Sequence, residues 1–296
     1  MSRILISGTL AYDDIGTFTT PLTAVTRNIK LDRLDRAFGG CAMNIAYNLA
    51  GLGDEPVPFV YTGDDYSGAY AHHVARCGIS EAGIFSIPGT PCARGIVLTG
   101  IDGVQFTAFY PGPSGLERWA GDLEQVIAGE PLEAVIIAPD LPEKMAGCAM
   151  RLAHLPRRVW CPGQYAELLD RDTVLAVLEA CSLLVVNRHE WQALCDRASA
   201  EAIRERVERI VITDGPRPVE LLPDGTRITV PAAAAAATID PTGCGDAFVA
   251  ALTGSLVHGA GLAAAVEAGI GLAGRCLASR GAQTHPVRSN DDFRSR

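Results

Sequence analysis

The amino-acid sequence predicts an α/β protein in which a mostly parallel sheet is covered by helices on both faces. Short apolar runs typical of buried strands alternate with helix-length segments whose apolar residues recur every three or four positions. Strands that alternate with helices form β-α-β units, which place helices on both faces of a parallel sheet. A chain of 296 residues, 48% of them hydrophobic, is long enough to bury one large core.

Strands are expected at short apolar runs, and helices at the amphipathic segments between them. The expected strands are Ile4–Ser7, Val57–Thr62, Ala134–Ala138, Leu183–Val186 and Ile210–Thr213. The expected helices include Ala42–Leu52, Tyr66–Cys77, Asp122–Ile127, Glu143–His154, a segment that follows Asp246, and Gly261–Ala278. The alanine run Ala232–Ala237 is interpreted as a small-residue connector. No linker is rich enough in Pro, Gly or Ser to separate independent domains, so residues 1–296 are expected to form one domain.

Two segments interrupt the strand-helix alternation. Residues Ala93–Tyr110 contain two β-rich runs around Asp102-Gly103, which is a hairpin signal, and Tyr12–Phe38 lacks helical periodicity. These segments are expected to pair into a small separate sheet, formed by about residues 12–38 and 92–112. The sheet is either a lid over a crevice or an immobile antiparallel extension, and the chemistry described below favours the lid.

The composition excludes several classes of protein. The formal net charge is −9 without a basic run, which is the wrong sign for a nucleic-acid partner. No apolar run reaches membrane-spanning length, and the first apolar run is too short for a signal peptide. The nine scattered cysteines form no C-x-x-C pair and indicate reduced thiols, so a cytoplasmic location is expected. With only two lysines, Lys30 and Lys144, phosphate chemistry must use arginine, backbone N–H groups, a helix dipole or a metal.

Gly243-Cys244-Gly245-Asp246 precedes a strong amphipathic helix pattern. Glycines at a helix start let successive backbone N–H groups point at one anion, and the helix dipole adds positive charge there. Asp246 in the first turn could then accept a proton from an attacking hydroxyl. Taken alone, the motif is equally compatible with a glycine turn followed by an N-terminal acid.

Other polar residues lie where an open α/β sheet binds ligands. Gly39-Gly40 opens a helix with Asn44 one turn further on, and Asp13 follows the first strand. Asn187 and Glu190 follow the strand 183–186 and could order water around Mg²⁺, or they could simply cap the next helix. Thr213-Asp214-Gly215 ends the next strand, and neither a P-loop nor a G-x-G-x-x-G motif is present.

Together these motifs resemble the ribokinase (PfkB-type) carbohydrate kinase family over nearly the whole chain. The segments GGCAMNIAYNLAGLG (39–53) and DPTGCGDAFVAAL (240–252) are similar to its two signatures. NRHE (187–190) and TDG (213–215) resemble its N-x-x-E motif and its nucleotide-binding turn. The resemblance implies a three-layer α/β/α sandwich with a small β lid, and transfer of the ATP γ-phosphate to a primary hydroxyl with Mg²⁺ and, in several members, K⁺.

The resemblance also implies a role for each matching residue. Asp246 is expected as the general base and Gly243, Cys244 and Gly245 as the anion hole. Asn187 and Glu190 are expected to organise Mg²⁺ through water, Thr213 and Gly215 to contact the nucleotide, and Asp240 and Thr242 to lie near K⁺. The expected substrate-binding residues are Thr9, Asp13, Gly39, Gly40, Asn44, Phe109 and Gln164.

Within the family, ISGTLAYDDI (6–15) and FYPGPSG (109–115) are most similar to the adenosine and nucleoside kinases. Phe109 could pack against a base or belong to the lid core. Departures from the adenosine-kinase pattern include Gly95 in place of an aromatic residue and CPGQY at 161–165. The substrate is therefore expected to be a nucleoside, with a free sugar or a catalytically silent ligand sensor as alternatives. Relatives occur as monomers and as lid-exchanged dimers, so either state is compatible with the sequence.

Overall fold

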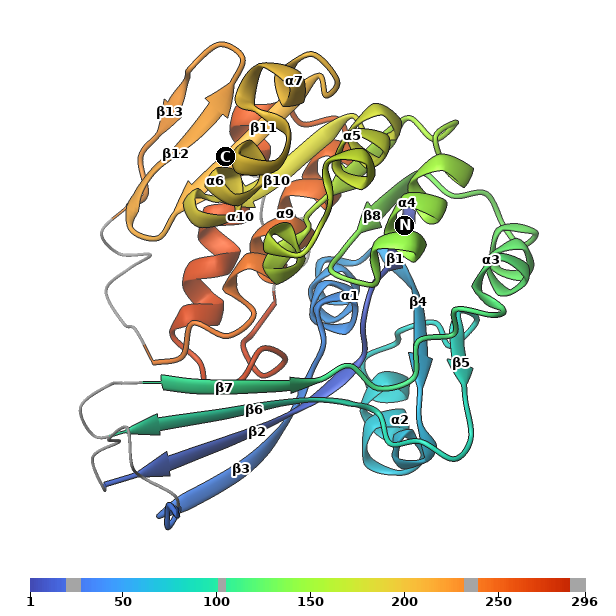
Figure 1. Ribbon diagram of the computed structural model, residues 1–296, viewed down its shortest axis with the longest axis vertical. Coiled ribbons are helices and arrows are strands. Elements are labelled where there is room, and N and C mark those ends of the chain that lie inside the picture. Colours follow the sequence, from blue (N-terminus) through green and yellow to red (C-terminus); the bar gives the residue numbers. More distant parts are fainter. Residues whose placement is uncertain (20–27, 101–104, 232–238, 288–296) are drawn as a thin grey trace.

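The structure, a computed structural model, describes residues 1–19, 28–100, 105–231 and 239–287, and these form two sheets with helices on both faces of the larger one (Figure 1). The larger sheet has nine strands in the order β13-β12-β11-β10-β9-β8-β1-β4-β5. Neighbours from β5 to β11 pair in parallel, and β12 and β13 are antiparallel. Its strands are β1 (Arg3–Ser7), β4 (Glu55–Thr62), β5 (Ile84–Ser86), β8 (Ala134–Ile137), β9 (Arg157–Trp160), β10 (Leu183–Asn187), β11 (Arg209–Asp214), β12 (Arg217–Leu222) and β13 (Arg227–Ile228).

The helices form two layers around this sheet. One layer holds α1 (Cys41–Leu52), α2 (Ala69–Arg76), α9 (Cys244–Val257) and α10 (Leu262–Leu277). The other layer holds α3 (Trp119–Ile127), α4 (Pro142–Arg151), α5 (Arg171–Ala180), α6 (Arg188–Ala198) and α7 (Ala200–Arg204). Two short 3₁₀ helices are η1 (Asp64–Tyr66) and η2 (Gly163–Glu167). None of the helices in the described ranges is long and apolar enough to cross a membrane.

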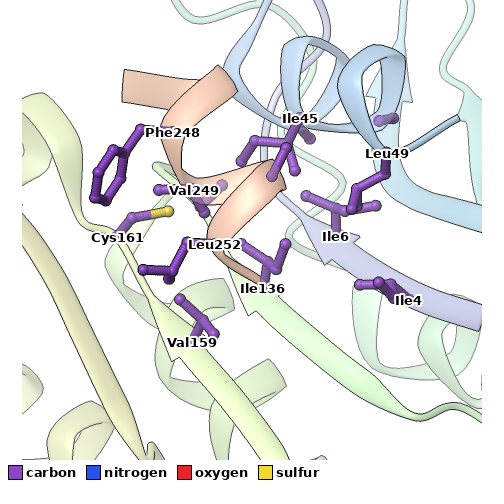
Figure 2. Packing of buried hydrophobic residues seen from close by; sticks show 14 of the residues in the cluster. Ile4, Ile6, Ile45, Leu49, Ile136, Val159, Cys161, Phe248, Val249 and Leu252 are labelled. Atoms are coloured by element: carbon purple, nitrogen blue, oxygen red, sulfur yellow. The ribbon is translucent and has the colours of Figure 1, made fainter. Parts of the chain in front are cut away.

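Strand alternation builds a separate core on each face of the sheet. Ile4 and Ile6 of β1 pack toward α1 and α9, whereas Leu5 between them packs toward the opposite layer. Figure 2 shows the first core, in which Ile45 of α1 and Leu252 of α9 lie over the strands. Because both faces are covered, the parallel strands carry continuous apolar runs, as the sequence predicted.

The smaller sheet has the order β3-β2-β6-β7 and projects from one side of the large sheet (Figure 1). Its strands are β2 (Ala11–Phe18), β3 (Arg33–Gly39), β6 (Ala93–Gly100) and β7 (Gln105–Tyr110). The antiparallel pairing of β6 with β7 agrees with the hairpin prediction, although its Asp102-Gly103 turn lies outside the described residues, as does the connector Ala232–Ala237.

One helix boundary differs from the sequence prediction. The helix expected at Tyr66–Cys77 divides into η1, which ends at Tyr66, and α2, which begins at Ala69. Gly68 between them has φ +98° and is the N-cap of α2. A residue at this φ cannot continue a right-handed helix. The apolar periodicity of residues 66–77 therefore belongs to two separate helices.

Candidate active site

Polar residues gather at the carboxyl ends of the parallel strands, where the strand order reverses between β1 and β8. Asn187 at the end of β10 and Thr213 in β11 are direct partners in the sheet register. Pro139 and Cys161 follow β8 and β9 and line the same cavity as Asn187 and Thr213. A crevice at such a switch point is the usual ligand site of an open α/β sheet.

Asp246 lies in the first turn of α9, whose N-cap is Gly243. Gly243 has φ +79°, and a Cβ added there would lie 2.4 Å from the Cβ of Ala282. Both facts require glycine at this position. The turn therefore places the backbone of residues 243–245 and the positive end of the α9 dipole at the start of the helix that carries Asp246. Of its N–H groups, that of Cys244 donates to the carbonyl of Pro241 at 3.2 Å.

Asp246 is held by polar contacts with α1. Asn44 Nδ2 donates a hydrogen bond of 2.8 Å to its Oδ2. The pKa of Asp246 is raised to about 7, mainly because the carboxyl group is buried. Hydrogen bonds from Asn44 and Cys41 lower this pKa, whereas the negative charges of Asp13 and Glu190 raise it. A carboxylate with a pKa near neutrality is suited to accept a proton at physiological pH.

Two cavities meet at the start of α9. The first, of about 460 Å³, is lined by Asp246, Cys41, Gln164 and Glu190 among others. The second, of about 490 Å³, is mainly apolar, and its lining includes Gly215 and Cys244. Both are lined by Asn187, Thr213, Gly245 and Phe248, so the glycine turn separates one chamber from the other. In the described part of the chain, neither lining includes an arginine or a lysine.

Asn187 and Glu190 form a capping box at the start of α6, as the structural alternative predicted. Asn187 donates to Glu190 through its backbone N (3.0 Å) and its Nδ2 (2.6 Å), and its Oδ1 accepts from the backbone N of Glu190 (2.9 Å). Burial raises the pKa of Glu190, which also lines the first cavity. Because a carboxylate can accept about four hydrogen bonds, the cap leaves Glu190 able to bind an ordered water.

Asp240 and Thr242 lie in the turn before α9. Asp240 Oδ1 accepts from the backbone N of Thr242 (3.0 Å) and Oδ2 accepts from the backbone N of Gly281 (2.9 Å). The Cys276 thiol donates to the carbonyl of Thr242 at 3.4 Å. The Asp240 carboxylate thus connects this turn to the segment that follows α10 through hydrogen bonds. Within the described ranges, no group of three or more His, Cys, Asp or Glu side chains could hold a metal ion.

A row of residues crosses the small sheet on one face. The register pairs Ala37 of β3 with Asp13 of β2, Asp13 with Gly95 of β6, and Gly95 with Phe109 of β7. Directly opposed residues share a face of a sheet, so Phe109 lies on the same face as Asp13, with Gly95 between them. A Cβ at Gly95 would lie 2.6 Å from Asp13 Oδ1. Burial, followed by the charges of Asp240 and Asp14, raises the pKa of Asp13 to about 6.

Gly39 and Gly40 join the small sheet to α1. A Cβ added at Gly39 would lie 2.2 Å from Asp13 Oδ2. Gly40 has φ +89°, and a Cβ added there would lie 2.6 Å from the carbonyl oxygen of Thr9. The Thr9 carbonyl accepts from the backbone N of Ala42 at 3.2 Å, which fixes the start of the helix. Asp13 therefore lies over the glycine pair, with Asn44 one helical turn beyond it.

Sequence reasoning missed several polar residues around the site. Lys144 is buried in an ion pair with Asp140 at 2.6 Å and lies over the rings of Phe59 and Tyr61, so it is unavailable for phosphate. A lysine in an amphipathic helix pattern gives no signal of such burial. Gln283, which follows α10, donates to Asn44 Oδ1 at 2.9 Å, and no motif marked it. The nine cysteines are free thiols, in agreement with the sequence interpretation.

Fold and site together define a small-molecule kinase with a ribokinase-like fold. The chain belongs to the pfkB family of carbohydrate kinases, whose family model matches residues 3–289. It is 24% identical to the nucleoside kinase of Methanocaldococcus jannaschii over 294 residues, which are 96% of this chain and 93% of that protein.

Two solved structures illustrate the range of similarity. The nucleoside kinase of Burkholderia thailandensis in complex with inosine is 29% identical, with a TM-score of 0.83 over 96% of this chain and 94% of that chain. A ribokinase from Thermotoga maritima is 20% identical, with a TM-score of 0.77 over 97% of each chain, a likeness that shows the fold alone.

Proposed function

We propose that the protein transfers the γ-phosphate of ATP to the ribose 5′-hydroxyl of a nucleoside, with Asp246 as the general base. The observation that carries the proposal is the position of Asp246, whose pKa is raised to about 7, at the glycine turn between two cavities. The names of the similar proteins support the substrate class, since the Burkholderia enzyme was solved with inosine and also with ADP-inosine.

The chemistry follows from the groups at the start of α9. As the nucleoside hydroxyl oxygen bonds to the γ-phosphorus, its proton moves to Asp246 and the bond from phosphorus to the ADP oxygen breaks. The N–H groups of Gly243 and Gly245, together with that of Cys244 once it leaves the Pro241 carbonyl, would hold the charge on the phosphoryl oxygens. The α9 dipole adds to this stabilisation within its first turn. Asp246 serves both as proton acceptor and as the residue that orients the hydroxyl.

The second cavity suits the nucleotide. Its mainly apolar walls would hold the adenine, with Thr213 and Gly215 at the turn beside it. Because no arginine or lysine from the described ranges lines either cavity, the phosphate charge needs Mg²⁺ in addition to the backbone. Glu190 fits that ion, since its carboxylate can hold a water of the Mg²⁺ shell and Asn187 fixes its orientation. When bound, Mg²⁺ supplies charge neutralisation on the phosphates.

The turn before α9 also fits K⁺. The Asp240 carboxylate accepts one backbone N–H on each oxygen and keeps further lone pairs, and Thr242 offers a carbonyl nearby. A cation at this turn would hold the chain on either side of the anion hole in place. K⁺ is therefore assigned to Asp240 and Thr242 within the proposal.

The small sheet would bind the nucleoside as a lid. The Asp13 carboxylate can accept hydrogen bonds from two vicinal ribose hydroxyls, with the Gly39–Gly40 turn close beneath. Asn44 retains a second hydrogen on Nδ2 for a hydroxyl. Gln164 lines the first cavity, and the Thr9 carbonyl lies beside Gly40. Phe109, on the Asp13 face of the sheet, would pack against the base. A free sugar is the second candidate, because the Asp13 carboxylate, and not an aromatic side chain, occupies the space over Gly95.

A substrate panel tests the proposal. ADP formation is measured with Mg²⁺, K⁺ and ATP against purine and pyrimidine nucleosides, ribose and hexoses, and the product is identified by mass spectrometry. Turnover to a nucleoside 5′-monophosphate is expected. Turnover on a free sugar alone replaces the nucleoside with the second candidate. Ligand-induced shifts of the melting temperature without turnover indicate a silent sensor and overturn the kinase assignment for this chain.

A further inference from the structure

A chain of buried hydrogen bonds runs away from Asp246 into the protein. Asn44 donates to Asp246 through Nδ2 at 2.8 Å, and its Oδ1 accepts from Gln283 Nε2 at 2.9 Å. Gln283 Oε1 lies 2.9 Å from Nε2 of His73 on α2. Asn44 and Gln283 are 4% and 5% exposed, so these bonds are shielded from water. Four elements that are far apart in the sequence meet in this chain.

The contact between Arg76 and His73 determines which group donates and which accepts in each of these hydrogen bonds. Arg76 can only donate, so Nδ1 of His73 at 3.1 Å must accept. Burial lowers the pKa of His73, and the ring is therefore neutral and carries its hydrogen on Nε2. That hydrogen bonds to Oε1 of Gln283, so the Gln283 amide nitrogen faces Asn44. The Asn44 carbonyl then faces Gln283, and its amide nitrogen faces Asp246.

We propose that Gln283 is a positioning residue for phosphoryl transfer, which it supports by keeping the Asn44 amide oriented as a donor to Asp246. The inference rests on the proposed role of Asp246 as general base. Without Gln283, the Asn44 amide can rotate by half a turn and place its carbonyl oxygen against the carboxylate. Two acceptors repel each other most when the carboxylate is ionised, so the rotated state favours protonated Asp246.

The same glutamine also reaches the glycine pair. Its Nε2 donates to the Tyr70 hydroxyl at 3.2 Å, and that hydroxyl donates to the carbonyl of Gly39 at 2.7 Å. Gln283 thus donates both of its amide hydrogens to groups that border the proposed substrate site. A residue needed only for packing would not require two directed donors at this position.

Other ionisable groups also face Asp246 and His73, and a Gln283 substitution leaves them unchanged. Those near Asp246 come from β2, α1, the end of β9, α6, the start of α9 and α10, and they are Asp13, Cys41, Cys161, Glu190, Cys244 and Cys276. The ionisable groups close to the His73 ring are Arg76, Cys77, Tyr47 and Tyr70. A change in the pH profile of a Gln283 variant therefore reports on the Asn44 contact.

The test compares pH profiles of kcat/KM in the full-length protein. In Gln283→Met, which keeps the length of the side chain, the acid limb of the kcat/KM profile is expected to move up by about one pH unit, with kcat/KM at pH 7 lowered about fivefold. His73→Phe keeps a ring stacked on Phe38, now 4.3 Å away, but removes the donor to Gln283. The His73→Phe variant is expected to move the acid limb of the kcat/KM profile in the same direction, by a smaller amount than Gln283→Met.

His285→Leu is the matched control. His285 lies two residues from Gln283 and hydrogen-bonds Asn48 Oδ1 on α1 at 2.7 Å, one turn beyond Asn44. This variant is expected to lower the melting temperature while the acid limb stays in place. A Gln283→Met protein that is merely less stable, with an unmoved limb, overturns the inference. Near-normal activity of Asp246→Asn would instead refute the proposed function, so the two failures are distinguishable.

Discussion

The two sheets of this protein differ in what covers them, and the candidate site uses both. Helices cover both faces of the nine-stranded sheet, and its inner strand residues, such as Ile6 and Ile136, are completely buried. The four-stranded sheet instead leaves large apolar side chains in contact with solvent: Leu34, Ile96 and Phe109 are 61%, 39% and 45% exposed. One region is a packed scaffold, and the other presents an open surface.

The residues proposed for the chemistry lie in the packed region, and those proposed for nucleoside recognition lie on the four-stranded sheet. Asp246, Asn44 and Gln283 belong to the packed region, where hydrogen bonds orient their side chains before any ligand arrives. Such preorganisation is what stabilising a transition state requires. Asp13 and Phe109 belong to the four-stranded sheet, which in this proposal closes over the substrate as a lid. Substitutions in the first region should change kcat, and those in the second should change KM.

Asp246→Asn is expected to have the largest effect. Loss of a general base should lower kcat by about 10²–10⁴-fold, with nucleoside binding by calorimetry retained. In the wild-type protein the base must be ionised. Because its pKa is raised to about 7, kcat/KM should fall about tenfold per unit below that pH and level off above it. A variant that retains more than a tenth of the wild-type kcat contradicts the assignment.

Much of the packed region could be predicted from the sequence because its signals are local. Apolar runs marked β1, β4, β8, β10 and β11, and the glycine turn marked the start of α9. The short strand β9 and the helices α5 and α7 did not stand out, because partly polar helix faces and a four-residue strand give weak periodicity. The helix α6 was expected only as the one that Asn187 could cap. The resemblance to a known family, which rests on four motifs, supplied the rest of the architecture.

The contacts that complete the site could not be predicted, because they join distant segments. Gln283 meets Asn44 across 239 residues of sequence, and neither residue carries a pattern that indicates the other. The row from Asp13 to Phe109 likewise depends on strand register, which a one-residue shift would reverse. Motifs identified individual residues, and only the fold revealed their partners.

Asp13→Asn tests recognition by the open sheet. The carboxylate loses charge-assisted hydrogen bonds to the ribose hydroxyls, so the nucleoside KM should rise about 10–100-fold while kcat changes little. The acid limb of kcat/KM should also move to lower pH, because the Asp13 charge raises the pKa of Asp246. The control is Asp14→Asn on the opposite face, whose carboxylate pairs with Arg36 at 2.7 Å. If both variants raise KM equally, damage to the sheet explains the loss.

Phe109→Ala should have the smallest effect, and it separates nucleosides from sugars. Removing an aromatic contact to the base should raise the nucleoside KM about threefold to tenfold and leave any activity on ribose unchanged. Phe106→Ala is the matched control, since Phe106 belongs to the same strand, is also exposed, and lies an odd number of positions away on the other face. An equal change in both variants, or an equal change for ribose, would mean that Phe109 supports the sheet without contacting the base. A change confined to nucleosides and to Phe109 would place base recognition on the open sheet and leave the packed region with the chemistry alone.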